Sequence, residues 1–233
     1  MDAKPLIAAL LLFTAGAAPA ETPRGPVVLE LFTSEGCSSC PPADALLTEL
    51  ATHPDLLPLA FHVTYWDSLG WKDPFSLAAA TARQRAYAEH LGSDTVYTPE
   101  LVVNGQRAVV GSDRGAVAAA IEAASHAAPA LASLRLRAGQ AGLAVDVGGG
   151  SGSATIWLAG YDHQHRTAIG RGENGGRTLL EANIVRSMRP IGTWTGQPMH
   201  FDVEPVAGEE AAVLLQAPDG RILGAARLER NGS

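Results

Sequence analysis

Apolar residues in the first half of the chain occur in two alternating patterns. Short continuous runs at 27–33 and 57–65 are typical of strands buried on both faces. Between the runs, apolar residues recur every three or four positions, which predicts helices at about 40–52, 74–91 and 114–127. Asn104-Gly105, between two further apolar runs, is typical of a hairpin turn. The predicted order is therefore β-α-β-α-β-β-α over about residues 26–128.

Beyond Pro129 the pattern changes to short segments in which apolar and polar residues alternate, separated by turns rich in glycine. Alternation with a period of two predicts strands, and no segment there has the period of a helix. The segments 155–161 and 183–188 are two of these predicted strands. We therefore expect a small, all-β antiparallel sandwich domain over residues 129–233, following an α/β domain over residues 21–128.

The first twenty residues have the pattern of a secretory signal peptide. Lys4 precedes an apolar stretch from Leu6 to Ala18, which is too short to span a bilayer, and Ala18-Pro19-Ala20 fits a cleavage site. We expect a mature chain that starts at Glu21, has no membrane span and is secreted or periplasmic. An uncleaved anchor is the alternative.

Composition and charge narrow the class of protein. Hydrophobic residues make up 46% of the chain and charged residues 18%, which is typical of a globular protein. The net charge is -7 and no long basic run is present, so nucleic acid is not expected as a partner.

The chain has two cysteines, Cys37 and Cys40, spaced C-x-x-C at the predicted turn from the first strand to the first helix. Helix N-terminal amides favour a thiolate over a thiol, so we expect a redox-active disulfide there. Cys37 is predicted to be the exposed nucleophile and Cys40 the resolving thiol. This motif and the element order together predict that the first domain is thioredoxin-like. A structural disulfide is the alternative.

Two further positions are candidates for catalysis. Thr98-Pro99 stands just before the third predicted strand, where thioredoxin-like folds carry a cis proline that faces the disulfide. Glu30 is the charged residue in the otherwise apolar first strand, and a buried carboxylate there could relay the proton of the resolving thiol. A trans loop proline and a solvent-facing Glu30 are the alternatives.

Aromatic and acidic residues cluster after the second predicted strand, in a chain with only 6% aromatic residues. They are a candidate binding wall beside the disulfide: His62, Tyr65, Trp66, Asp67, Trp71 and Asp73. His62 could also join Cys37 and Cys40 as a soft site for Cu(I) or Zn. Ordinary loop packing is the alternative interpretation.

A glycine-rich segment in the second half carries Arg171, Glu173 and Asn174, which could bind a ligand or form contacts between domains. A solvated loop is the alternative on residue types alone. No Walker loop and no H-E-x-x-H motif is present in the sequence.

The stretch from Glu30 to Asp44, with its Gly-Cys-Ser-Ser-Cys-Pro-Pro-Ala-Asp motif, resembles the opening motif of an uncharacterised secreted bacterial thioredoxin-like family, a family of unknown function. The segments 62–73, 83–87, 97–99 and 171–174 resemble the same family, and the likeness covers nearly the whole mature chain. Thr64 and Glu100 depart from the residues expected there. The resemblance implies that the loop at Arg171–Asn174 packs against the first domain or the site.

These observations favour an extracytoplasmic thiol–disulfide oxidoreductase that acts on protein thiols or disulfides. Its cofactor would be the Cys37–Cys40 disulfide itself, with no metal. Two alternatives stay open: a copper or other metal carrier that uses Cys37, Cys40 and His62, and a non-catalytic interaction module with a structural disulfide.

Overall fold

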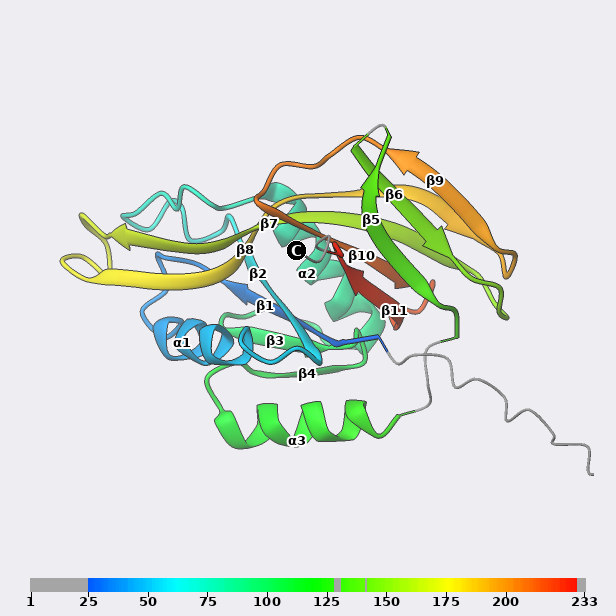
Figure 1. The fold of residues 1–233 in the computed structure, drawn as a ribbon. Coiled ribbons are helices and arrows are strands. Elements are labelled where there is room, and N and C mark those ends of the chain that lie inside the picture. Colours follow the sequence, from blue (N-terminus) through cyan, green and yellow to red (C-terminus); the bar gives the residue numbers. More distant parts are fainter. Residues whose placement is uncertain (1–24, 128–130, 141, 230–233) are drawn as a thin grey trace, which may run out of the picture.

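The computed structural model describes residues 25–127, 131–140 and 142–229 (Figure 1). The first elements along the chain are β1 (Val27–Thr33), α1 (Pro41–Leu50), β2 (Leu56–His62), α2 (Ala78–Leu91), β3 (Glu100–Val103), β4 (Arg107–Val110) and α3 (Arg114–Ser125). The later elements are β5 (Leu134–Gly139), β6 (Gly142–Val147), β7 (Ala154–Ala168), β8 (Thr178–Trp194), β9 (Met199–Val203), β10 (Glu210–Gln216) and β11 (Ile222–Arg227). The element order predicted for the first half is confirmed.

Eight of these strands form one mixed sheet in the order β11-β10-β7-β8-β2-β1-β3-β4. In it, β1 pairs in parallel with β2 and in antiparallel with β3. Strand β8 joins β2 in parallel at Ala60 and Ile184, and Asn183 Nδ2 donates to the carbonyl oxygen of Pro58 at 2.7 Å. Strands β5, β6 and β9 form a separate three-stranded sheet. The two halves of the chain are therefore joined where β8 pairs with the edge of β2 that faces away from β1.

The predicted fold class is wrong. We expected a thioredoxin-like α/β domain followed by a small all-β sandwich, but β7, β8, β10 and β11 continue the sheet that the first half begins. The period of a strand shows which of its faces is buried, whereas it does not show which other strand pairs with its edge. The apolar run of β2 fits a free edge and a paired edge equally well, and the pairing with β8 decided the architecture.

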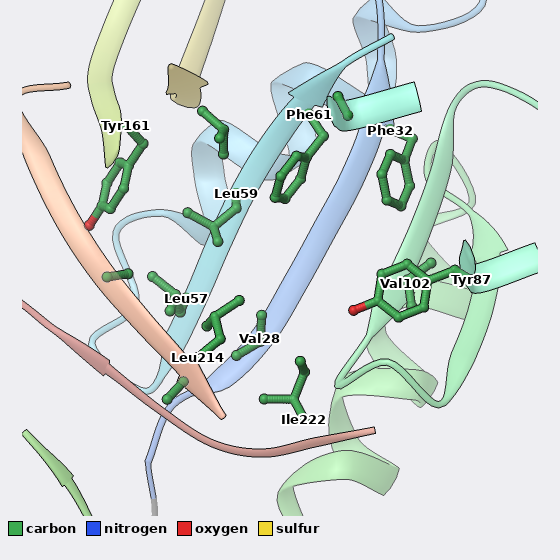
Figure 2. Close-up of a cluster of buried hydrophobic side chains, with 14 of the residues drawn as sticks. Val28, Phe32, Leu57, Leu59, Phe61, Tyr87, Val102, Tyr161, Leu214 and Ile222 are labelled. Atoms are coloured by element: carbon green, nitrogen blue, oxygen red, sulfur yellow. The ribbon is translucent and has the colours of Figure 1, made fainter. Parts of the chain in front are cut away.

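The main hydrophobic core draws on both halves of the chain. Val28 and Phe32 of β1 and Leu57 of β2 belong to the same buried cluster as Leu214 of β10 and Ile222 of β11 (Figure 2). The amide of Ile222 also donates to the carbonyl oxygen of Asn104 at 2.9 Å, which ties β11 to the end of β3. A core shared in this way cannot be divided into the two bodies that the pattern predicted.

The helices cover the two faces of the β1–β3 region. Leu29 and Leu31 of β1 pack with Leu46 and Leu47 of α1 and with α3, whereas α2 packs on the opposite face through Tyr87. Side chains alternate between the faces of a strand, so neighbouring residues of β1 lie in different cores. The sheet β5-β6-β9 covers β7, β10 and β11 over a third apolar cluster.

Several element boundaries differ from the sequence pattern. Helix α2 begins at Ala78 and not near Pro74, because Leu77 is extended and its amide donates to the carbonyl oxygen of His62 at 2.9 Å. Strands β7 and β8 run for 15 and 17 residues, well beyond the predicted 155–161 and 183–188. They pair along almost their whole length, from Ala154 with Trp194 to Ala168 with Thr178, and so form one long hairpin. The turn at Asn104-Gly105 is confirmed, with positive φ at both residues.

Two predictions concern the ends and the membrane. The predicted signal peptide at 1–20 and the predicted boundary at 128–129 fall on residues outside, or at the edge of, the described part of the chain. In the described ranges, none of the helices is long and apolar enough to cross a membrane, consistent with the expectation for the mature chain.

Candidate active site around the Cys37–Cys40 disulfide

The predicted disulfide between Cys37 and Cys40 is present, and it lies in the turn between β1 and α1. Cys40 is the N-cap residue of α1 and Pro41 follows in its first turn, where the missing amide hydrogen costs little. The turn is closed by the amide of Cys37, which donates to the carbonyl oxygen of Ser34 at 3.1 Å. The end of a buried strand and the start of a helix thus fix both sulfur atoms.

Cys37 is fully buried, so the prediction of an exposed nucleophile does not describe this structure. Its sulfur lies 3.3 Å from the hydroxyl oxygen of Ser39, and the hydroxyl of Thr98 donates to it at 3.4 Å. The hydroxyl oxygen of Thr98 in turn accepts a hydrogen bond from Trp66 Nε1 at 2.8 Å. The motif alone cannot reveal this cover, because Thr98 and Trp66 come from other parts of the chain.

The Thr98–Pro99 peptide bond is cis, as predicted, and it leads directly into β3. The carbonyl oxygen of Pro99 accepts a hydrogen bond from the amide of Gly111 at 2.9 Å, which fixes the segment from its far side. Because the Thr98 hydroxyl contacts Cys37, this segment and the disulfide belong to the same site.

The loop between β7 and β8 packs on the cysteine turn, as the resemblance implied. Asn174 Nδ2 donates to the carbonyl oxygens of Glu35 and Cys37, each at 2.9 Å, and Asn174 is 1% exposed. Glu173 accepts a hydrogen bond from the amide of Ser38 at 3.2 Å. Arg171 is exposed to solvent. The projecting β7–β8 hairpin therefore carries a clamp on the site, made of Glu173 and Asn174.

The aromatic and acidic segment after β2 forms part of the scaffold of the site. Trp71 Nε1 donates to Glu35 Oε2 at 2.7 Å, and the hydroxyl of Tyr65 donates to Gln84 Oε1 at 3.2 Å. Asp67 accepts a hydrogen bond from the Ser76 hydroxyl at 2.7 Å. The residues of the candidate wall thus lie near the disulfide, and most of their polar atoms form hydrogen bonds within the protein.

A buried polar cluster lies beside the cysteine turn and consists of Glu35, Asp44, His62, Asp73 and Glu181. Asp73 Oδ2 contacts His62 Nδ1 at 2.7 Å and accepts the amide hydrogen of Glu35 at 2.9 Å. His62 Nε2 lies 3.8 Å from Glu181 Oε1. Among the described residues, Asp44 Oδ2, His62 Nε2 and both carboxylate oxygens of Glu181 have no hydrogen-bond partner.

Burial controls the protonation of this cluster. It raises the pKa of Asp44 to about 7 and that of Glu181 to about 8, because a charged carboxylate is poorly solvated there. Burial also disfavours the charged form of His62, but the negative charges of Asp73 and Glu181 outweigh it and raise the pKa to about 10. Burial tends to raise the pKa of Asp73, but the charge of His62 together with hydrogen bonds from His62 and from the backbone amides of Glu35 and Phe75 lowers it overall. The cluster therefore holds protons on carboxyl groups near neutral pH.

Asp44 is the member of the cluster that lies on α1, the helix that Cys40 caps. It lies four residues after Cys40 on α1, and its amide donates to the carbonyl oxygen of Cys40 at 3.1 Å. Side chains four apart share a helix face and lean toward the helix N-terminus, so the Asp44 carboxyl group lies one turn below Cys40. Its Oδ1 accepts a hydrogen bond from the Thr33 hydroxyl at 2.7 Å.

Glu30 does not lie with the disulfide. It is buried in β1 on the face that packs against α2, where it forms an ion pair with Arg83 and accepts a hydrogen bond from the Tyr87 hydroxyl at 2.7 Å. Helix α1 packs on the opposite face, against Leu29 and Leu31. Glu30 is therefore separated from the disulfide, whereas the buried carboxyl group of Asp44 lies on the same helix as Cys40.

The geometry does not favour a metal site made of Cys37, Cys40 and His62. Both ring nitrogens of His62 face carboxylates, Nδ1 toward Asp73 and Nε2 toward Glu181. The part of the chain that the structure describes holds no group of three or more His, Cys, Asp or Glu side chains arranged to bind a metal ion.

Three members of the cluster, Glu35, Asp44 and Glu181, were not among the candidate site residues. Glu35 had a usable signal in its place two residues before Cys37. Asp44 had a usable signal, because the predicted helix places it one turn from Cys40 among apolar neighbours. No sequence signal could have identified Glu181, because it reaches the site only through the pairing of β8 with β2.

The fold and the site define a class of protein with one large mixed sheet, flanking helices and a buried C-x-x-C disulfide at a helix N-terminus. Within it, the chain belongs to the family described as "Protein of unknown function (DUF1223)", whose match covers residues 28–216. This confirms the predicted membership in an uncharacterised family.

Two solved structures are similar to this chain, and no curated protein matches it. The crystal structure of protein AGR_C_4864 from Agrobacterium tumefaciens has 29% sequence identity and a TM-score of 0.79, and the likeness covers 89% of this chain and 96% of that one. HBP35 of Porphyromonas gingivalis has 15% identity and a TM-score of 0.55, over 90% of this chain and 78% of that one. The second likeness concerns the fold alone.

Proposed function

We propose that this protein is a secreted or periplasmic thiol–disulfide oxidoreductase that exchanges the Cys37–Cys40 disulfide with thiols or disulfides of partner proteins. The observation that carries the proposal is the setting of the Cys37 sulfur. It lies next to the start of α1 and accepts a hydrogen bond from Thr98 at 3.4 Å, beside the cis peptide bond to Pro99. Helix N-terminal amides and a hydroxyl donor both favour the thiolate form of a cysteine.

The exchange would proceed by two displacements at sulfur. A partner thiolate attacks the Cys37 sulfur, the bond to Cys40 breaks, and Cys40 leaves as a thiolate. Asp44, which burial keeps protonated up to about pH 7, then gives its proton to that thiolate. A second thiolate of the partner then attacks the partner's own sulfur in the mixed disulfide, and Cys37 leaves as a thiolate, so the partner is oxidised and the pair is reduced. When the pair reduces a partner disulfide, the Cys37 thiolate attacks it and displaces one partner thiolate; Asp44 then takes the proton of Cys40, which attacks Cys37 and releases the second partner thiolate.

Because Cys37 is buried, exchange also requires that its cover moves. The clamp of Glu173 and Asn174 is attached to the cysteine turn by three hydrogen bonds. Apart from Ile169 and Asn174, which are buried, the residues of the β7–β8 loop at 169–177 are exposed. A partner that displaces the tip would uncover the turn without unfolding either core.

The experiment is a titration of the oxidised protein with glutathione buffers of graded potential, with trapping by alkylation and mass analysis. We expect a two-electron equilibrium between ~-270 and ~-120 mV, the range of known dithiol enzymes. In the reduced protein, Cys37 should be alkylated faster than Cys40. A disulfide that is reduced only in parallel with global unfolding would overturn the proposal and support a structural bridge.

The proposed location has its own test. N-terminal sequencing of the protein recovered from an exporting bacterial host should start at Glu21, after the predicted signal peptide. An intact N-terminus in a membrane fraction would support the uncleaved anchor.

A further inference from the structure

A cleft with a volume of about 420 Å³ lies between α2 and strands β7, β8 and β10. Its volume is in the range of small-molecule sites, about 300–1,000 Å³. Helix α2 lies on the face of β1 opposite α1 (Figure 1), and none of the residues that line the cleft contacts the disulfide. The cleft is thus separate from the candidate active site.

The side walls of the cleft are apolar, and one of them is made of small residues. Ala79, Ala82 and Ala86 line it from α2, and all three are exposed to solvent. Trp157 of β7 and Met188 of β8 line it from the sheet, and both are only partly buried. An indole ring and a thioether next to short side chains provide an apolar surface that can adapt to a flat guest.

One end of the cleft is polar and rigid. Arg83 forms its ion pair with Glu30, donates through Nη1 to Gln216 Oε1 at 3.1 Å, and donates through Nη2 to the Tyr87 hydroxyl at 3.0 Å. Its guanidinium carbon also lies 5.6 Å from the centre of the Trp157 ring. These contacts hold the guanidinium group in one orientation beside the aromatic wall.

The charge and the hydrogen bonds of Arg83 determine the kind of ligand that would fit. Glu30 neutralises the guanidinium charge, so an anionic ligand would meet no net positive charge. A guanidinium group has five N–H donors. The contacts to Glu30, Gln216 and Tyr87 use four of them, and the second hydrogen of Nη1 takes no part in these bonds.

We propose that this cleft binds an uncharged, largely apolar small molecule that carries one hydrogen-bond acceptor, such as a carbonyl oxygen. The apolar body lies between the alanines of α2 and the Trp157 and Met188 side chains, and the acceptor faces Nη1 of Arg83. The site does not depend on the proposed exchange chemistry, because it shares no residue with it.

The test is displacement of the neutral fluorescent probe N-phenyl-1-naphthylamine from the oxidised protein. Three competitors of similar shape test which chemical group the cleft prefers. Benzophenone has a carbonyl acceptor, diphenylmethane lacks it, and 4-benzoylbenzoate has the carbonyl and also a negative charge. We expect saturable probe binding and displacement by benzophenone at about tenfold lower concentration than by either of the others, as for one hydrogen bond to a charged group.

Variants on one helix provide the matched control. Ala86→Phe places a ring in the cleft and should weaken probe binding by about tenfold or more, whereas Ala78→Phe, exposed on α2 but outside the cleft, should leave it within about twofold. Ala82→Leu is a smaller second block, in case Ala86→Phe does not fold. Three results would overturn the proposal. The first is that the probe does not bind, and the second is that it binds equally well to folded blocked variants and to the control variant. The third is that 4-benzoylbenzoate displaces it best. Because the disulfide stays oxidised throughout, none of these results bears on the exchange activity.

Discussion

Replacing Asn174 with alanine tests how strongly the β7–β8 hairpin is attached to the cysteine turn. The side chain is buried and donates to two carbonyl oxygens, those of Glu35 and Cys37, each at 2.9 Å. Its own oxygen accepts a hydrogen bond from Arg177 Nη1 at 3.0 Å. The carbonyl oxygen of Cys37 also accepts the amide hydrogen of Cys40 at 3.2 Å, so the substitution takes the side-chain donor mainly from the carbonyl oxygen of Glu35. A buried polar group left without a partner costs about 1–3 kcal/mol, which predicts a loss of about that size in the free energy of unfolding.

The measurement is urea unfolding of the oxidised protein, with the disulfide intact in every variant. The midpoint should fall while the slope stays unchanged, because the same surface is exposed on unfolding. Arg171→Ala, on the exposed side of the same loop, is the control and should change the stability by less than about 0.5 kcal/mol. Asn174→Asp should destabilise more than Asn174→Ala at neutral pH, because a carboxylate would face two carbonyl oxygens.

The same Asn174 variant has a kinetic consequence. If the clamp covers Cys37, dithiothreitol should reduce the disulfide of Asn174→Ala faster than that of the parent, under conditions where both proteins are folded. A stability loss below about 0.5 kcal/mol, the level of an ordinary surface change, together with an unchanged rate of reduction, would refute the idea of a clamp.

Three further predictions concern Asp44 and Thr98 at the candidate site and Glu30 on the opposite face of β1. Burial raises the pKa of Asp44 from 3.8 to about 7, so the folded protein keeps a proton that the unfolded chain releases; the free energy of unfolding should fall as pH rises from about 4 to 7. Asp44→Asn should remove roughly 2–4 kcal/mol of that fall, as read from urea curves at several pH values, and an unchanged pH profile would contradict the assignment. Thr98→Val should raise the thiol pKa of reduced Cys37, measured by the pH dependence of iodoacetamide alkylation, whereas Thr98→Ser should not. Glu30→Gln leaves Arg83 without its counter-charge and should cost about 3–5 kcal/mol of stability without changing cysteine reactivity; a changed alkylation rate would show that Glu30 acts on the site after all.

The local structure of the first half was predictable because it depends on short-range patterns. Apolar runs marked β1 and β2, and Asn104-Gly105 marked the hairpin between β3 and β4 through two residues that tolerate positive φ. The cysteine motif and Thr98-Pro99 located the site for the same reason. Each of these signals lies within a few residues of the feature that it predicts.

The parts that could not be predicted depend on contacts between distant segments. The parallel pairing of Ala60 with Ile184 joins the two halves, and it brings Glu181 into the polar cluster. Strand periodicity indicates that β2 and β8 are buried, but it carries no information about which strand pairs with which. The burial of Cys37 was missed for a similar reason, because its cover comes from Thr98, Trp66 and the β7–β8 loop.

The clamp also has a consequence for the order of events during synthesis of the chain. Asn174 lies 137 residues after Cys37, so a chain that emerges from its N-terminus presents both cysteines well before the residue that covers them. During that interval a thiol oxidant can reach the pair directly. Once the β7–β8 hairpin docks, the pair is enclosed, and any reagent must displace the hairpin tip before it reaches the sulfur.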